Sequence, residues 1–420
     1  MKKVQGEKLL ILEFVIMVLM IISSMIILQI RGIAFFVFMQ IFFCVYVFCI
    51  TKKICFFKEI FINMIFIEIL ISAAVACFSN VPISYKKSAI YITILLFPVY
   101  FTTAYINSSV MRKQEILDVI KKAIQIMCLI QLIWCVVQFL LSLFFKIDIN
   151  EILFVQVFHF VEKGSSIQNG LVKGSGLSWH PALMAPVFVF SYVLFDSMIV
   201  KGLIIIDAVV CGNSTALLGV LACIGLDMLQ KVVKVIKKKR FNGLKVLIVG
   251  SFCLIGVFFL IKTGFIYKLV DKIIYTYYRI TGVVNDGGSA LAHKRYFTAY
   301  PEVLKISTPL QIIFGYGEGG SGYPFGILFN QYSTLSSWAV ESDIMNILIS
   351  RGIVGFLCYY SFLGYIAVKG SKINFKYVIC IVVLIIEGIT YNIQFDWVFM
   401  LEIIMLICIK NQYDFFGKRE

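Results

Sequence analysis

The side chains that could do chemistry are concentrated between residues 279 and 351. They are cations, carboxylates and a histidine, interrupted by glycine-rich backbone: Arg279, His293, Arg295, Phe314-Gly-Tyr-Gly-Glu-Gly-Gly, Glu341, Asp343 and Arg351. A guanidinium presents a planar fork of donors that fits phosphate oxygens. The pattern therefore indicates a binding site for a phosphate-bearing ligand. The alternative is that the cations only contact lipid headgroups and the glycines only form turns.

Nucleotide and metal sites are not indicated. The glycine-rich segment that begins at Phe314 lacks the Lys-Ser/Thr of a phosphate-binding loop and follows no Rossmann strand. The chain has no Asp-x-Asp pair, and its cysteines show no CxxC or Cys/His spacing. We therefore expect neither a metal nor a cofactor, and a bound diphosphate would be neutralised by Arg and Lys.

The composition places these residues in a membrane protein. Charged residues make up only 15% of the 420 residues, whereas hydrophobic residues make up 60% and the mean hydropathy is +0.94. Soluble domains contain roughly 25% charged residues. Apolar material on this scale, with only 7 prolines, predicts long helices in lipid and excludes a soluble fold.

Long apolar runs predict the membrane spans. They cover residues 9–30, 32–50, 60–78, 89–106, 123–145, 181–199, 246–262, 342–368, 375–393 and 395–409. The stretch 202–229 is predicted to form two short helices that turn at Gly212-Asn213-Ser214, either as a shallow or re-entrant pair or as spans extended by their neighbours. Its residues could not cross a core of about 30 Å twice at full length.

The basic residues predict the orientation. Most Lys and Arg fall in segments on one side of the predicted spans, whereas the short loops on the other side hold only Arg31, Lys86 and Lys87. Positive loops are typically cytoplasmic, so we expect both termini in the cytoplasm. The net charge of +15 follows from this pattern and does not indicate a nucleic-acid partner.

Two long loops, 146–180 and 263–341, are then predicted on the extracytoplasmic face. Amphipathic helices are expected in both, at 149–161 and 265–279. The expected fold is an all-α polytopic membrane protein, a single membrane domain over residues 1–420 with about 11–12 transmembrane helices. A site on this face could meet a lipid whose diphosphate lies at headgroup depth.

Four motifs follow one another over about residues 165–370. They are Lys173-Gly-Ser-Gly-Leu-Ser-Trp-His180-Pro, Asn213-Ser-Thr-Ala-Leu-Leu-Gly, Ser289 to Arg295 followed by Phe314-Gly-Tyr-Gly, and Glu341-Ser-Asp leading to Arg351-Gly-Ile-Val-Gly. Their order resembles the bacterial O-antigen and capsular polysaccharide polymerase family (Wzy-type), which is related to the O-antigen ligases. Thr215 and Lys173 stand where Arg is common in that family.

The resemblance implies a glycosyltransferase of the bacterial cytoplasmic membrane that joins undecaprenyl-diphosphate-linked oligosaccharide repeat units at its outer face. It also implies contacts with membrane lipids, a chain-length regulator and a flippase. The implied roles are catalysis for Glu341 and Arg295, with Asp343 in reserve, and diphosphate binding for Arg295, Arg279, Lys173 and Arg351. His180 and His293 would contact substrate.

Structural roles for the same residues remain open. Glu341 could only favour a helix N-terminus, Arg295 could be an interfacial anchor, His180 could cap the next helix, and His293 could be solvated. Arg351, about ten residues inside its predicted span, requires a partner such as Glu387 or Asp207, or the diphosphate itself.

Two other functions compete with the polymerase. An O-antigen ligase usually carries His-Asn where this chain has Glu341-Ser342, which favours the polymerase. A transporter or flippase would show paired intramembrane charges, broken helices in both halves and internal symmetry. From the sequence, only 202–229 looks broken.

Overall fold

The computed structural model describes residues 2–30, 32–108, 113–168, 171–237, 289–329, 340–392 and 396–417. The chain divides into two compact units, one made of Met1–Ile224 with Ser307–Glu420 and the other of Gly225–Ile306. The described residues are mostly helical, and their only strands form two short hairpins. The predicted all-α class is confirmed.

The first half of the chain begins with α1 (Lys2–Ser23), the hairpin β1 (Gln29–Ile30) and β2 (Ile33–Ala34), α2 (Phe35–Thr51), α3 (Ile60–Phe78), α4 (Ile83–Ser108) and α5 (Lys113–Phe145). It continues with the π-helix η1 (Glu151–Val157), the hairpin β3 (Ile167–Gln168) and β4 (Leu171–Val172), the 3₁₀-helix η2 (Pro181–Met184), α6 (Ala185–Leu194), α7 (Met198–Cys211) and α8 (Ser214–Lys237). The second half contains α11 (Ser289–Ile306), α12 (Pro309–Phe314), α13 (Gly322–Phe329), α14 (Asp343–Ser350), α15 (Gly352–Gly370), α16 (Lys376–Thr390) and α17 (Asp396–Lys410).

Five of the described helices, α3, α4, α5, α8 and α15, are long and apolar enough to cross a membrane. The chain is thus a helical protein suited to a membrane, as its composition predicts. The predicted span 60–78 coincides with α3, because Lys58-Glu59 and Ser79 bound a mostly apolar run. The predicted span 246–262 lies outside the described residues.

The first predicted span is shorter than expected. Helix α1 ends at Ser23, whose hydroxyl donates to the Met20 carbonyl, and the chain then turns into the hairpin β1–β2. Gly32 has a φ of 80°, which the tight turn of a hairpin requires. Residues 24–30 therefore do not extend the helix.

The break within 202–229 lies where the sequence predicts it. Gly212 ends α7 with a φ of 59°, and the Asn213 side chain accepts hydrogen bonds from the backbone N–H groups of Thr215 (2.9 Å) and Ala216 (3.2 Å) at the start of α8. The helices are longer than expected, however. At 14 residues α7 extends about 21 Å, whereas α8 alone could cross a membrane.

Two predicted spans are broken in the structure. The run 181–199 is divided between η2, α6 and the start of α7, because the polar Asp196-Ser197 interrupts it. The run 342–368 is divided at Arg351 into α14 and α15, and Gly352 has a φ of 67° at the break. Arg351 therefore stands at a helix start and not inside a helix.

The two long predicted loops contain ordered elements. In the first, η1 occupies part of the predicted amphipathic helix 149–161, and the hairpin β3–β4 pairs Ile167 with Val172. In the second, α12 and α13 belong to the first unit, whereas α11 belongs to the second. The predicted helix 265–279 lies outside the described residues.

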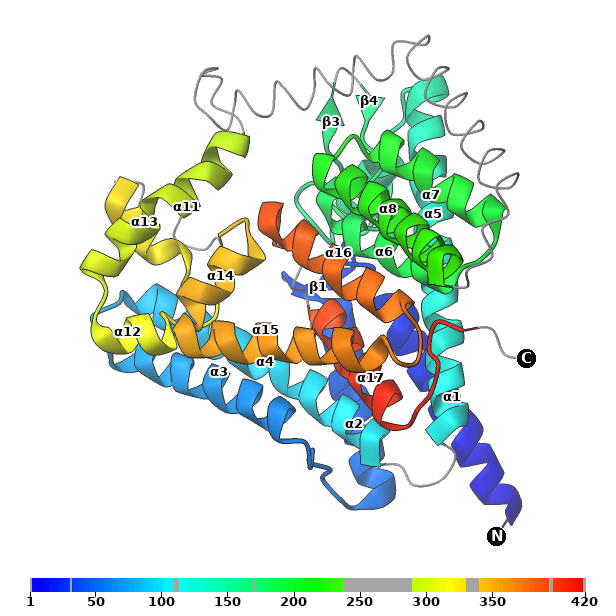
Figure 1. Cartoon of the computed structure of the whole chain (residues 1–420), viewed down its shortest axis with the longest axis horizontal. Helices are drawn as coiled ribbons and strands as arrows, with labels where there is room; N and C mark the ends of the chain where they lie inside the picture. Colours follow the sequence, from blue (N-terminus) through cyan, green and yellow to red (C-terminus); the bar gives the residue numbers. More distant parts are fainter. Residues whose placement is uncertain are drawn as a thin grey trace. The chain divides into compact units, whose positions relative to one another are not determined.

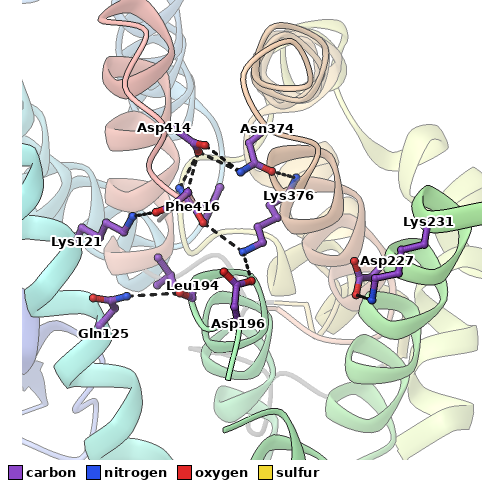
Figure 2. A network of polar contacts seen from close by, with 11 residues as sticks. Lys121, Gln125, Leu194, Asp196, Asp227, Lys231, Asn374, Lys376, Asp414 and Phe416 are labelled. Atoms are coloured by element: carbon purple, nitrogen blue, oxygen red, sulfur yellow. Dashed lines mark hydrogen bonds and ion pairs between the residues drawn. The ribbon is translucent and has the colours of Figure 1, made fainter. Parts of the chain in front are cut away.

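Within the first unit, α3 lies beside α4 and α15, and α1 packs along α5 (Figure 1). The segment after α17 ties several helix ends together (Figure 2). Asp414 accepts hydrogen bonds from Asn374 (3.1 Å) and from the backbone of Gly417 (2.9 Å), and Lys376 donates to the Phe416 carbonyl (3.2 Å) and pairs with Asp196 (2.8 Å). We call residues 411–417 the C-terminal clasp.

Candidate functional site

Four segments meet at the C-terminal end of α16. The Ser342 hydroxyl donates to the Gly388 carbonyl at 3.2 Å, and the hydroxyls of Thr215 and Thr390 are 2.8 Å apart. The Gly174 backbone N–H donates to the Val210 carbonyl at 3.3 Å. These contacts join the segment 173–181, the α7–α8 turn, the start of α14 and the end of α16. We call this meeting point the α16-end site.

His180 is part of the α16-end site. Its ring stacks on that of Tyr391 with centroids 5.4 Å apart and an interplanar angle of 1°, and its Nδ1 accepts a hydrogen bond from the Ala182 backbone N–H at 3.2 Å. Burial, together with the charges of Lys173 and Lys163, lowers the pKa of His180 to about 4. The imidazole is therefore neutral at neutral pH, with its proton on Nε2.

His180 also caps η2, as the sequence allowed. The capping uses Nδ1 alone, and the ring still faces Tyr391. The structural role and a role in contacting substrate are therefore compatible in one side chain.

The two predicted carboxylates lie on this site with different exposure. Glu341 is partly exposed and lies close enough to Tyr391 for an electrostatic interaction. Asp343, the first residue of α14, is only 2% exposed and lies near Gly388 and Glu387 of α16. Solvent and substrate can therefore reach Glu341 more easily than Asp343.

Lys173 directly follows strand β4 and contributes a cation to the α16-end site. Its backbone N–H donates to the Ser166 carbonyl at 2.8 Å, and the following loop is held by the Cys211 thiol, which donates to the Gly174 carbonyl at 2.8 Å. The Lys173 side chain is partly exposed, and its charge acts on His180. A cation, a neutral imidazole, a tyrosine and an accessible carboxylate thus come together from distant parts of the sequence.

Arg351 does not belong to this group. Its Nε donates to a Glu318 carboxylate oxygen, and its Nη1 lies 3.6 Å from Glu68 Oε1. Neither Glu387 nor Asp207, the partners considered from the sequence, pairs with it: Glu387 lies against Gly219, and Asp207 lies beside Cys135. Arg351 is 8% exposed, and the structure brings it to Glu318 and Glu68 and not to the α16-end site, so its role as a diphosphate ligand stays a prediction.

The glycine-rich segment after Phe314 packs against the residues that precede the break at Arg351. The backbone N–H groups of Tyr316 and Gly317 donate to the carbonyls of Ile349 (2.9 Å) and Ser350 (2.8 Å) at the end of α14. Gly315 has a φ of 80°, and a Cβ there would overlap the Ser350 carbonyl. This segment therefore packs on the α14–α15 break and brings Glu318 to Arg351.

Sequence reasoning missed Glu68 and Glu318 as partners. A signal existed for Glu68, because an acid in the middle of an apolar run requires a partner and Arg351 is a cation in another such run. Nothing in the sequence around Glu318 indicates which cation it meets.

The remaining predicted residues are not joined to the α16-end site by the structure. Arg295 and His293 stand on α11, in the second unit, and Arg279 lies outside the described residues. Within the described ranges, no cluster of three or more His, Cys, Asp or Glu side chains could hold a metal ion. The α16-end site therefore offers acid–base and hydrogen-bonding groups.

No family model matches the chain, and no curated protein sequence matches it. The functional assignment of the chain therefore rests on its own residues and their geometry.

Proposed function

We propose that the protein is a polysaccharide polymerase of the bacterial cytoplasmic membrane. It joins undecaprenyl-diphosphate-linked oligosaccharide repeat units on the extracytoplasmic face, with both termini in the cytoplasm. The donor is a growing glycan on its lipid diphosphate, and the acceptor is a single lipid-linked repeat unit. The lipid diphosphate is already an activated leaving group, so neither nucleotide nor metal is required.

In this reaction an acceptor hydroxyl oxygen forms a bond to the anomeric carbon of the donor as the bond from that carbon to the diphosphate oxygen breaks. Glu341 takes the hydroxyl proton, with Asp343 in reserve. Lys173, Arg295 and Arg279 bind the diphosphate and stabilise the charge that develops on it. His180 and His293 contact substrate, and the neutral His180 donates from Nε2.

The observation that carries this proposal is the convergence of Lys173, His180, Glu341 and Tyr391. The first three belong to motifs whose order resembles the polymerase family, and they lie far apart in the sequence. A merely structural helix start would not require a partly exposed acid beside a stacked His–Tyr pair and a lysine. The convergence therefore supports chemistry at this end of α16.

Replacing Glu341 with Gln tests the proposal. Because a general base contributes about 10²- to 10⁴-fold, Glu341→Gln should reduce polymerisation by a factor in this range while the protein still inserts. Chain length is read on gels of extracted glycan, and lipid-linked single repeats should accumulate on the outer leaflet.

Glu162→Gln is the control, because it removes an exposed acid of the first long loop and should leave chain length unchanged. Normal polymer from Glu341→Gln would exclude Glu341 as the base.

A transporter of lipid-linked oligosaccharide is the second candidate, favoured by one specific observation. The structure contains a buried cluster of charged groups, Arg351 with Glu318 and Glu68, and a broken helix at that cluster in addition to the α7–α8 break. Transporters commonly use both features.

The two candidates differ in the leaflet where intermediates accumulate. Loss of a polymerase leaves single repeats accessible from outside, whereas loss of a flippase leaves them on the inner leaflet. A ligase would instead leave finished chains on the lipid carrier. Labelling of accumulated lipid-linked glycan by a membrane-impermeant reagent separates the first two cases, and gel analysis of chain length separates the third.

A further inference from the structure

The α14–α15 break contains a cluster of one cation and two acids. Glu68 of α3, Glu318 of the glycine-rich segment and Arg351 at the break come from three separate parts of the chain, and all three are buried. A Cβ at Gly355 would lie 2.6 Å from Glu68 Oε2, so this glycine makes room for the carboxyl group. Helices α3 and α15, which carry Glu68 and Gly355, pack against each other (Figure 1).

The two acids make different contacts with the guanidinium. Glu318 accepts a hydrogen bond from Arg351 Nε, the charge-assisted contact that a carboxylate counter-ion makes with a guanidinium. Glu68 Oε1 is 3.6 Å from Arg351 Nη1, beyond hydrogen-bond length, and within the described residues neither Glu68 oxygen has a hydrogen-bond partner. Glu318 therefore acts as the counter-ion, and Glu68 does not.

The charge of the cluster then decides the state of Glu68. One guanidinium and two carboxylates carry a net negative charge, and burying an uncompensated charge without hydrogen bonds is far less favourable than burying a neutral carboxylic acid. The cluster becomes neutral when one acid holds a proton. Because Glu318 already makes the charge-assisted contact, the proton falls to Glu68.

We propose that the Arg351–Glu318–Glu68 cluster is an intramembrane proton-binding site in which Glu68 holds the proton. This inference does not depend on the polymerase proposal. The groups that face Glu68 are Arg351, Glu318 and the Cys358 thiol. The central carbon of the Arg351 guanidinium lies 5.9 Å from the centroid of the Tyr359 ring. Loss of the proton would set two carboxylates in competition for one guanidinium.

The helix break between α14 and α15 is hydrogen-bonded to the part of α3 that carries Glu68. On α3, one turn beyond Glu68, the Ser72 hydroxyl donates to the Ser350 carbonyl (2.5 Å) and accepts from the Gly317 N–H (3.1 Å). The same small region therefore holds the end of α14, the glycine-rich segment and the proton. Protonation of Glu68 is linked to the packing of all three.

Infrared spectroscopy of the purified full-length protein in lipid nanodiscs tests the inference. The C=O stretch of a protonated carboxyl group is separate from the bands of a carboxylate and shifts in D₂O. At neutral pH, the difference between wild type and Glu68→Gln should contain one such band. Glu318→Gln should also lose it, because Glu68 must then become the counter-ion of Arg351.

Glu302→Gln is the matched control, because Glu302 is exposed on α11 and pairs with Lys305. It should remove a carboxylate band and leave every protonated-carboxyl band in place. The inference is overturned if Glu68→Gln removes a carboxylate band instead. It is also overturned if wild type labelled with carboxyl-¹³C glutamate shows no shifted protonated band, a result that requires no variant to fold.

Discussion

At the scale of single residues, the chemistry of the α16-end site depends on which side chains are charged. Burial, with the charges of Lys173 and Lys163, lowers the pKa of His180 and keeps it neutral, so the positive charge at this site resides on the two lysines. The sequence suggested the residue types, since a Lys, a His and a Glu stood in motifs with a shared order. It could not show that Tyr391 completes the group, because the ring lies at the end of an unremarkable apolar run.

His180 makes the stability of the protein depend on pH. Its pKa is lowered from 6.5 to about 4 in the folded state, so stability is fully present above pH 6.5 and is lost as the pH falls towards 4. We expect a loss of roughly 1 to 3 kcal/mol across this window. His180→Asn keeps an acceptor for the Ala182 N–H but does not titrate, and its unfolding temperature should vary less with pH. An equal pH dependence in both proteins would contradict this account.

At the scale of elements, the helix breaks account for most differences between prediction and structure. An apolar run predicts a span well where charged residues bound it, as at α3. The break at Arg351 could not be predicted in this way, because it is stabilised by Glu68 and Glu318 from remote segments. The run 181–199 carried a local signal in Asp196-Ser197, and the α7–α8 turn carried a stronger one in Gly212-Asn213, where a left-handed residue precedes a helix cap.

Gly352 is required at the break. Its φ is 67°, and a Cβ would overlap the Ile313 carbonyl, so Gly352→Ala should destabilise the protein by more than about 1 kcal/mol. Gly364 is the matched control within the same helix, because a Cβ there meets nothing within 4 Å. Gly364→Ala should be neutral or slightly stabilising. Thermal unfolding in detergent compares the two, and equal unfolding temperatures would show that the break tolerates a side chain.

At the scale of the whole molecule, the C-terminal clasp connects parts of the first unit that the sequence leaves unrelated (Figure 2). Lys121 of α5 donates to the Gly417 carbonyl, and Tyr377 of α16 donates to the Tyr413 carbonyl at 3.2 Å. Composition predicted a membrane protein and hydropathy predicted most helices. Neither could predict the clasp, because residues 411–417 carry no periodic pattern and gain their order only from neighbours distant in sequence.

Phe416 should be one of the residues on which the clasp depends most. Its ring is 1% exposed and meets Tyr377 with centroids 4.8 Å apart. Phe416→Ala should therefore cost about 3 to 5 kcal/mol. Phe144→Ala removes a ring that is 70% exposed at the end of α5 and should have a much smaller effect. Denaturation followed by tryptophan fluorescence measures both, and similar losses would contradict a structural role for the clasp.

The clasp also sets the order in which the protein can be completed during synthesis. Helices α5 and α16 are synthesised before the clasp, so Lys121 and Lys376 have no access to the carbonyls of Gly417 and Phe416 until those residues have left the exit tunnel. The clasp contacts of these two lysines therefore form last. In that interval a nascent chain would offer the two helix ends to chaperones and proteases.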